Sequence, residues 1–119
     1  MNKIIVYGIP TCDVTKKALA WLKQNNLVFN FHDYKKEGIT AAKLNNWSKV
    51  KSWEMLLNKR GTTWKTIDPA IQQVIIDQKS AVQLMLSYTS LIKRPLIEAV
   101  GTILIGYNEA AYQEVLLKI

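Results

Sequence analysis

The chain has one cysteine, Cys12, and one histidine, His32, among its 119 residues. A single cysteine excludes a disulfide bond within the chain. One residue of each type also excludes a zinc site built from the usual four cysteine and histidine ligands. We therefore expect no bound metal and no tightly bound cofactor. If Cys12 reacts, a thiol from outside the chain must resolve the product, because no second cysteine is present.

Long hydrophobic runs are also missing. The apolar run after Lys3 ends at Pro10 and is too short for a secretory signal peptide, and no segment approaches the roughly 20 apolar residues that span a bilayer. Apolar residues make up 49% of the chain and charged residues 21%, as in ordinary globular proteins. We expect a cytoplasmic protein without membrane contact, folded as a single domain over residues 1–119.

Acidic residues are scarce, with nine Asp and Glu against 16 Lys and Arg and a net charge of +7. Between Lys35 and Lys65, eight basic residues stand against two acidic ones, so this middle third carries +6. A solvated helical surface is the simplest interpretation. The alternatives are attraction of a small anion or docking on an acidic macromolecule. No helix-turn-helix, zinc finger or RNA-binding aromatic motif is present, so we expect no direct binding of nucleic acid.

The stretch that ends at Cys12 carries the strongest chemical signal. The β-branched run Ile4–Val6 predicts a short buried strand, and apolar residues at helical spacing over Val14–Leu22 predict a helix. Pro10 and Thr11 lie in the connection and are expected to shape it. Cys12 then lies at a helix N-terminus, where free N–H groups and the helix dipole favour a thiolate. It is either a reactive nucleophile or a buried structural cysteine.

The remaining pattern predicts the order β-α-β, a helical insertion at about 39–88, and then β-β-α. The expected elements of the first and last parts are a helix over 12–24 with a stop at Asn25-Asn26, a strand over 27–32, a polar exit over 34–38, strands over 96–100 and 102–105 joined at Gly101, and a helix capped by Asn108. Within the insertion we expect N-caps at Thr40, Ser52 and Ser80, a loop over 60–63, and a helix that begins at Asp68-Pro69 with Ile71, Val74 and Ile75 as its apolar residues.

Four motifs in this order resemble the ArsC family. They are Tyr7–Cys12 followed by Lys16–Ala18, Phe31–Gly38, Leu57–Trp64 and Leu91–Ile97. The similarity extends over nearly the whole chain and is greatest to the YffB-type branch, with the Spx and MgsR regulators as near relatives. It implies an α/β fold of the thioredoxin/glutaredoxin type with a four-stranded mixed sheet.

The resemblance also implies roles for individual residues. Cys12 matches the nucleophile of the family's arsenate reductases, which attacks arsenic and is resolved by glutathione and glutaredoxin. Arg60 and Arg94 match two of the arginines that hold the oxyanion, and a guanidinium fork suits both a tetrahedral anion and a nearby thiolate. Pro95 matches the cis proline beside the cysteine, and X–Pro bonds are where cis peptides occur.

Three positions depart from the family's reductases and regulators. Gly8 stands where the arsenate reductases have a histidine, and Tyr107 where they have a third arginine. Thr15 replaces the second cysteine of the regulators' CxxC switch, so Cys12 cannot form that internal disulfide. Tyr107 remains a candidate for binding the substrate or anion, whereas the isolated His32 is interpreted as structural.

The residues and the resemblance together predict a thiol-dependent reductase with Cys12 as its nucleophile. Its reductant would be glutathione or another small thiol, acting with glutaredoxin or thioredoxin. Its substrate would be a small oxyanion or an oxidised thiol. Arsenate is expected to be a poor substrate. The alternative is a regulator without enzymatic activity that binds RNA polymerase, as Spx does.

Overall fold

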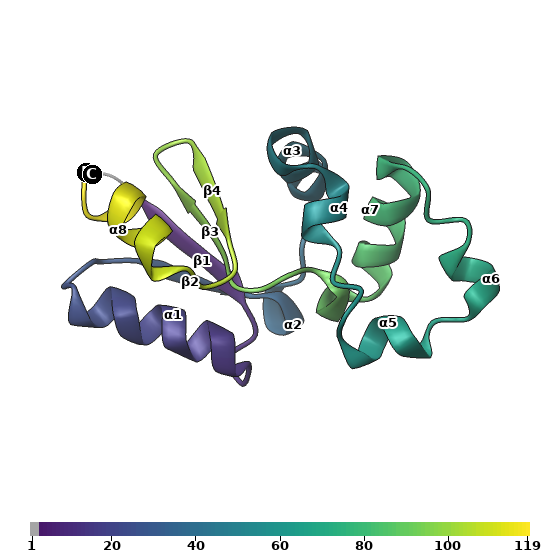
Figure 1. The fold of residues 1–119 in the computed structure, drawn as a ribbon, viewed down its shortest axis with the longest axis horizontal. Coiled ribbons are helices and arrows are strands. Elements are labelled where there is room, and N and C mark those ends of the chain that lie inside the picture. The colour runs from purple at the N-terminus through teal and green to yellow at the C-terminus, as the bar shows by residue number, and fades with distance from the viewer. Residues whose placement is uncertain (1–2) are drawn as a thin grey trace. The chain divides into compact units, whose positions relative to one another are not determined.

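A computed structural model describes residues 3–119 of the chain (Figure 1). The chain forms two compact units. The first, here called the sheet unit, comprises residues 3–37 and 94–119, and the second, the helical unit, comprises Gly38–Lys93. The helical unit includes the segment at about 39–88 that was predicted as a helical insertion.

The sheet unit contains a four-stranded mixed sheet. Its strands are β1 (Ile4–Gly8), β2 (Asn30–Asp33), β3 (Leu96–Ala99) and β4 (Thr102–Ile105), in the order β2-β1-β3-β4. Strands β1 and β2 are parallel, as a β-α-β crossover requires, while β3 is antiparallel to both β1 and β4. This topology is that of the thioredoxin-like fold, so the predicted fold class is confirmed.

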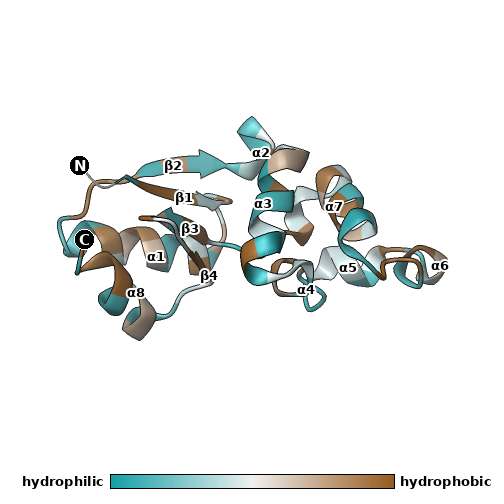
Figure 2. Cartoon of the chain, turned by 90° about the horizontal axis from the view of Figure 1, so that it is seen from above, coloured by the Kyte–Doolittle hydropathy of each residue, from teal (hydrophilic) through white to brown (hydrophobic). Residues whose placement is uncertain are grey.

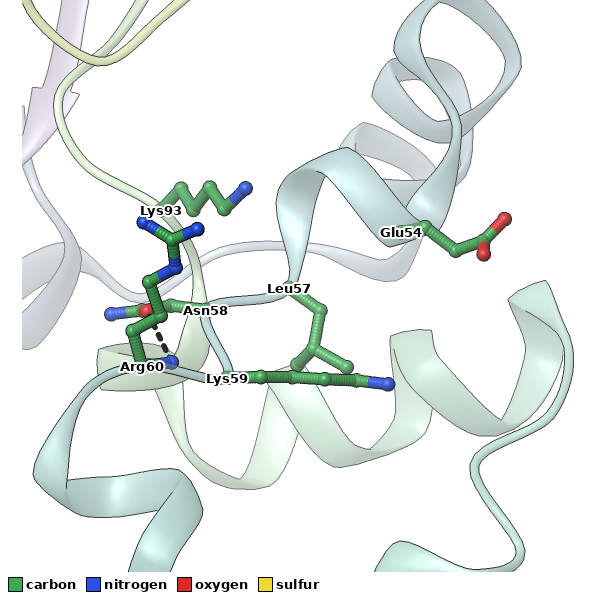
Figure 3. Close-up of a pocket in the computed structure, with 6 residues that line it drawn as sticks. All are labelled: Glu54, Leu57, Asn58, Lys59, Arg60 and Lys93. Atoms are coloured by element: carbon green, nitrogen blue, oxygen red, sulfur yellow. Dashed lines mark hydrogen bonds between the residues drawn. The ribbon is translucent and has the colours of Figure 1, made fainter.

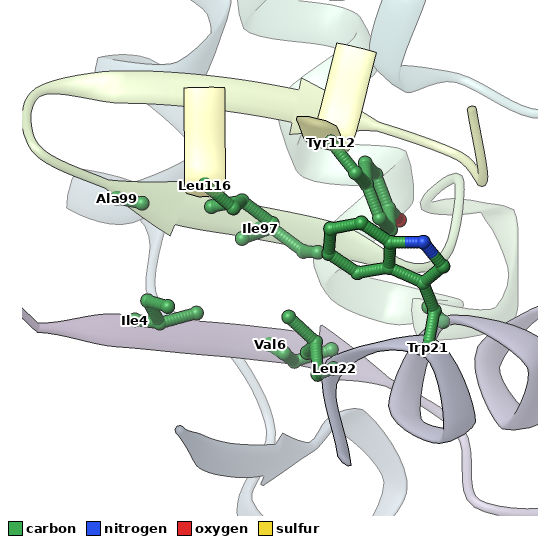
Figure 4. Packing of buried hydrophobic residues seen from close by; sticks show 9 residues of the cluster. Ile4, Val6, Trp21, Leu22, Ile97, Ala99, Tyr112 and Leu116 are labelled. Carbon is green, nitrogen blue, oxygen red and sulfur yellow. The ribbon is translucent and has the colours of Figure 1, made fainter. Parts of the chain in front are cut away.

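Alternation along the strands places the core of this unit on one face of the sheet. Ile4 and Val6 of β1 and Ile97 of β3 are buried there under the helices α1 (Asp13–Gln24) and α8 (Glu109–Leu116) (Figure 4). Trp21 of α1 meets Tyr112 of α8 edge to face, with ring centroids 5.4 Å apart. Each such buried side chain contributes roughly 1.5–3 kcal/mol, so this cluster anchors α1 against the sheet.

The polarity of the strands follows their positions in the sheet. Strand β1 lies inside the sheet and is hydrophobic over most of its length, whereas β2 lies at the edge and is largely hydrophilic (Figure 2). Strands β3 and β4 form the predicted hairpin at Gly101, but β3 ends at Ala99, and Val100, expected at the end of the strand, belongs to the turn; both turn residues have positive φ. Such two-residue turns match the twist of a hairpin.

The helical unit contains five α-helices and a short 3₁₀ segment within the described part of the chain. They are α3 (Ala41–Lys51), α4 (Trp53–Leu56), α5 (Thr62–Thr66), α6 (Pro69–Gln72), α7 (Gln78–Ser87) and η1 (Thr89–Leu91). Helix α3 packs on α4 and α7 through the fully buried side chains of Leu44, Trp47, Leu56 and Met85. The predicted caps at Thr40 and Ser52 are confirmed, since their hydroxyls accept the N–H groups of residues 43 and 55.

Two predictions in the sheet unit need correction. The second strand begins at Asn30 rather than at residue 27, because Ile5 of β1 pairs with Asn30 and the N–H of Leu27 instead donates to Leu22 at the end of α1. The segment predicted as a polar exit contains the helical turn α2 (Tyr34–Glu37), whose first side chain, Tyr34, is buried.

Two further predictions in the helical unit were wrong in detail. The loop expected over 60–63 is shorter, because α5 already begins at Thr62. Helix α7 is capped by Asp77 and not by Ser80. The Asp77 carboxylate accepts the N–H of Ser80 while the Ser80 hydroxyl accepts the N–H of Asp77, which is a capping box. Among residues 3–119, no helix is long and apolar enough to cross a membrane.

Candidate functional site

A tight turn between β1 and α1 presents Cys12. The N–H of Cys12 donates to the carbonyl oxygen of Ile9 at 3.0 Å, which places Pro10 and Thr11 in the middle of the turn. Cys12 is the N-cap of α1, with extended backbone angles, and its carbonyl accepts the N–H of Lys16 at 2.9 Å as the first hydrogen bond of the helix. Both predicted features, the helix N-terminus and the shaping turn, are therefore present.

The surroundings of the Cys12 sulfur favour its charged form. Partial burial of the thiol raises its pKa, but interactions with the N–H and hydroxyl of Thr15, the N–H of Val14 and the charge of Arg94 outweigh this and hold the pKa below the usual value for cysteine. None of these donors meets the geometry of a formal capping hydrogen bond, so they act together on a partly exposed sulfur. Cys12 thus has the lowered pKa that a nucleophilic cysteine needs.

Thr15 acts on the Cys12 sulfur, a role that the sequence did not predict for it. Its side chain is fully buried, and within the described residues its hydroxyl has no protein partner other than the Cys12 sulfur. A Cβ atom at Gly8 would lie 2.8 Å from this hydroxyl oxygen and 2.9 Å from the Thr15 methyl group. Gly8 and Thr15 are therefore fitted to each other, and no side chain enters at residue 8 while Thr15 keeps its position. The signal for Thr15 was a hydroxyl residue one helical turn after the cysteine.

Arg94 supplies the positive charge that acts on the Cys12 sulfur. It immediately precedes β3, and its peptide bond to Pro95 is cis. Pro95 is buried, and its carbonyl oxygen accepts the N–H of Gly106 at 2.7 Å, which ties the start of β3 to the end of β4. The charge of Arg94 lowers the pKa of the Cys12 thiol. Its predicted role as a ligand of a substrate anion stays a prediction.

Aromatic side chains fill the sheet face opposite the core. The hydroxyl of Tyr7 donates to Glu98 at 2.8 Å, and the rings of Tyr7 and His32 lie 4.8 Å apart. Tyr34 stacks on Tyr7 at 6.2 Å, and burial strongly raises the pKa of its phenol, which therefore stays neutral at physiological pH. Among the described residues, no protein group accepts or donates a hydrogen bond at the Tyr34 hydroxyl. This packing agrees with the structural interpretation of His32.

Tyr107 lies on the core side of the sheet unit. Its half-buried ring packs edge to face against Tyr112, with centroids 5.3 Å apart, and the Tyr112 hydroxyl donates to the carbonyl oxygen of Gly106 at 2.6 Å. These contacts account for an aromatic residue at this position. A role for Tyr107 in binding the substrate or anion stays a prediction.

Arg60 belongs to the helical unit, and Arg94 to the sheet unit. Arg60 lines a pocket of about 390 Å³ with Lys59, Lys93 and three other residues (Figure 3). Its backbone N–H donates to the side-chain oxygen of Asn58 at 3.0 Å. The prediction that Arg60 helps to hold an anion at Cys12 therefore stays a prediction. No group of three His, Cys, Asp or Glu side chains in residues 3–119 is arranged to hold a metal ion.

Comparison with known proteins agrees with the motifs in the sequence. A model of the ArsC family matches residues 7–115. A protein of Haemophilus influenzae described as uncharacterized is 40% identical over 110 residues, which cover 92% of this chain and 96% of that protein. The regulatory protein MgsR of Bacillus subtilis is 23% identical over 109 residues, which cover 90% of this chain and 85% of MgsR.

Two solved structures are about as similar in sequence to this chain as the Haemophilus influenzae protein is. The YFFB protein is 39% identical with a TM-score of 0.91, and the match covers 96% of this chain and 99% of that one. An arsenate reductase (ArsC) related protein from Brucella melitensis is also 39% identical, with a TM-score of 0.75 and coverage of 94% and 92%. An arsenate reductase from Vibrio cholerae, at 14% identity and a TM-score of 0.77, shares the fold.

Proposed function

Since the chain belongs to the ArsC family, we propose that it is a thiol-dependent reductase in which Cys12 is the nucleophile and a small external thiol, such as glutathione, completes the cycle. Arsenate reductase-like structural neighbours support redox chemistry in general. The observation that carries the finer proposal is the lowered pKa of Cys12. It results from donors and a cation that converge on one sulfur at the start of α1.

The proposed reaction has two exchange steps. The Cys12 thiolate attacks one sulfur of a glutathione mixed disulfide, so that a bond forms between Cys12 and the glutathione sulfur while the substrate leaves as a thiolate and takes up a proton. A second glutathione thiolate then attacks this new disulfide and releases Cys12 together with oxidised glutathione. In total, the mixed disulfide and one molecule of glutathione give the substrate thiol and oxidised glutathione, and the proton of that glutathione passes to the substrate thiolate. The external thiol is required because Cys12 is the chain's only cysteine.

A substrate of low charge suits this site better than arsenate does. Attack of a thiolate on a multiply charged oxyanion is repulsive, and the family's arsenate reductases offset the repulsion with arginines. Tyr107 offers at most one hydrogen bond and no charge at the third of these positions. Loss of one charge-assisted hydrogen bond, worth about 1.5–3 kcal/mol, reduces the rate roughly 10- to 100-fold when it is felt in the transition state. We therefore expect arsenate to be a poorer substrate than a glutathione mixed disulfide.

The test combines a titration with a comparison of substrates. The rate of Cys12 alkylation is measured against pH, and turnover is then measured with arsenate, a glutathione mixed disulfide and a peroxide in the presence of glutathione and glutaredoxin. We expect a midpoint below the usual value near ~8.5 and preference for the mixed disulfide. A midpoint at or above ~8.5 would leave Cys12 a structural cysteine. Efficient arsenate reduction that Tyr107→Arg does not improve would contradict our interpretation of Tyr107.

The second candidate is a regulator that binds RNA polymerase. It is favoured by the similarity to MgsR and to the Spx proteins, which are named as transcriptional regulators. Thr15 in place of a second cysteine removes the internal disulfide but does not affect binding through the basic helical unit. The deciding experiment is co-purification with the subunits of RNA polymerase, with the Cys12→Ser variant in parallel. Stoichiometric capture without turnover of any thiol substrate would favour the regulator.

A further inference from the structure

Strand β3 carries one charged side chain, Glu98, on the sheet face opposite the core. Its neighbours in the strand, Ile97 and Ala99, belong to the core cluster, so alternation turns Glu98 toward the other face. There it is half-buried, and the hydroxyl of Tyr7 donates to its Oε1 at 2.8 Å. Because Tyr7 belongs to β1, this hydrogen bond joins two strands and holds the carboxylate in place.

The strand register places Arg94 toward Cys12 from Glu98. The two strands are antiparallel, with Glu98 opposite Ile5 and the first residue of β3 opposite Tyr7. Residues earlier in the chain therefore lie closer to the end of β1 that leads to the turn and to Cys12. Arg94 precedes β3 by one residue and lies beyond its last pair at that end. Along the sheet, the arginine thus stands between the thiol and the carboxylate.

The buried phenol of Tyr34 lies within the range of both charges. Its ring is 6.2 Å from that of Tyr7, and burial, followed by this neighbouring phenol, raises its pKa. The negative charge of Glu98 adds to the rise, and the positive charge of Arg94 opposes it. The same arginine acts on the Cys12 sulfur. One guanidinium is therefore close enough to act on the groups around Glu98 as well as on the thiolate.

A fixed carboxylate near a guanidinium changes what that guanidinium offers to a third group. Opposite charges offset each other in the field that they produce together, and half-buried charges are screened by salt less than exposed ones are. The carboxylate also repels any other anion that approaches. A neutral molecule is affected much less by either contribution. Such a pair therefore discriminates between molecules by their charge.

We propose that Glu98 is a specificity-determining residue of the Cys12 site. Its carboxylate, held by Tyr7, offsets the positive charge of Arg94 and disfavours anionic substrates relative to neutral and cationic ones. This inference rests on the proposed function in so far as it speaks of substrates. Selection by charge at the sulfur is measurable without turnover, so the two are tested separately.

Two alkylating agents measure this selection directly. Iodoacetate is an anion and iodoacetamide is neutral, and with each the Cys12 thiolate forms a thioether and expels iodide. The readout is the ratio of their rate constants at one pH, in which the ionised fraction of Cys12 cancels. Glu98→Gln keeps an oxygen that accepts from Tyr7 but loses the charge, and should raise the iodoacetate-to-iodoacetamide ratio roughly three- to tenfold. An unchanged ratio would overturn the inference.

Two control variants separate Glu98 from less specific effects. Glu114→Gln removes the same charge from the exposed surface of α8 and should leave the ratio unchanged. Tyr34→Phe removes a buried hydroxyl without any change of charge and should also leave it unchanged. A rise in Glu114→Gln equal to that in Glu98→Gln would show that net charge alone controls the ratio. An equal rise in Tyr34→Phe would assign the effect to packing.

A double variant tests whether Glu98 acts through Arg94. In the background of Arg94→Ala, Glu98→Gln should change the ratio much less than it does in the wild type. The full effect in that background would show direct repulsion by Glu98 and would overturn the part assigned to Arg94. Circular dichroism of each variant confirms that the fold is retained.

Turnover extends the test to substrates. Glutathione mixed disulfides of cysteamine and of 3-mercaptopropionate differ in the charge of the leaving thiol. We expect the wild type to prefer the cysteamine disulfide and Glu98→Gln to lose part of this preference. Turnover of neither disulfide would contradict the proposed function, while the alkylation ratios would still decide the role of Glu98. Turnover of both at equal rates by the wild type would overturn the assignment of Glu98 to specificity.

Discussion

The two units of this protein differ in how they use positive charge. The helical unit has eight basic and three acidic residues, whereas the rest of the chain has eight and six. In the sheet unit, one arginine, two backbone N–H groups and a buried hydroxyl act on a single sulfur. In the helical unit, three basic side chains line a pocket and form no salt bridge within the described residues. The first arrangement stabilises a charge that belongs to the protein, whereas the second gathers several basic side chains around one pocket.

The largest effect is expected from Cys12→Ser. Serine keeps the size and the N-cap position but loses the reactive thiolate, so turnover of mixed disulfides should fall to the uncatalysed background. Turnover is measured as oxidation of glutathione, and retention of the fold by circular dichroism. Wild-type turnover in a folded Cys12→Ser variant would show that Cys12 is not the nucleophile.

Core truncations test whether the units differ in stability as well as in charge. Leu22→Ala in the sheet unit and Leu44→Ala in the helical unit each remove a fully buried side chain and should each cost about 2–5 kcal/mol in the free energy of unfolding. Amide hydrogen exchange then measures local opening in each unit. We expect each variant to accelerate exchange mainly in its own unit. Equal acceleration everywhere would mean that the chain unfolds as one block.

Thr15→Val tests whether the buried hydroxyl lowers the pKa of Cys12. Valine keeps the shape beside Gly8 but donates no hydrogen bond, so the pKa of Cys12 should rise, and Thr15→Ser should restore it. The measurement is the rate of alkylation against pH. An unchanged pKa in Thr15→Val would remove Thr15 from the site, whatever its effect on stability.

The same pKa shift has a consequence for stability. Since the pKa of Cys12 is lower in the folded chain, the thiolate contributes stability that is fully present above the unfolded pKa, near ~8.5, and is lost as the pH falls through the folded pKa. The difference in unfolding free energy between the wild type and Cys12→Ser should therefore grow as the pH rises toward ~8.5. The difference should grow less with pH when both proteins carry Thr15→Val.

The smallest effect concerns the two arginines. Arg94→Ala should raise the pKa of Cys12, because it removes a charge that acts on the sulfur, and Arg94→Lys should restore part of the shift. The family resemblance predicts a rise from Arg60→Ala as well, and we expect it to be the smaller of the two. An unchanged thiol titration in Arg60→Ala would show that Arg60 does not act on the Cys12 sulfur.

Much of the fold follows from local signals in the sequence. The run Ile4–Val6, the turn at Gly101 and the cap at Asn108 predicted their elements correctly, because each depends on residues close together in the chain. The start of β2 was predicted three residues too early, at Leu27. Leu27 is apolar but pairs with no residue of β1, and the first residue of a strand depends on its pairing with the neighbouring strand. The sequence predicted Ser80 as the N-cap of α7, but the N-cap is Asp77, and Ser80 completes the capping box as the third residue of the helix.

The sequence by itself determined that Cys12 is the only thiol, that it follows a strand and begins a helix, and that the central region is strongly basic. These properties depend on composition and on neighbours in the chain. Only the tertiary structure decided which groups act on the sulfur. Thr15 is buried against Gly8, and the charge of Arg94 comes from a segment some eighty residues away, because β1 pairs with β3. The pocket of the helical unit is likewise a product of the Leu57–Ile92 bridge, which brings Lys93 to the segment of Arg60.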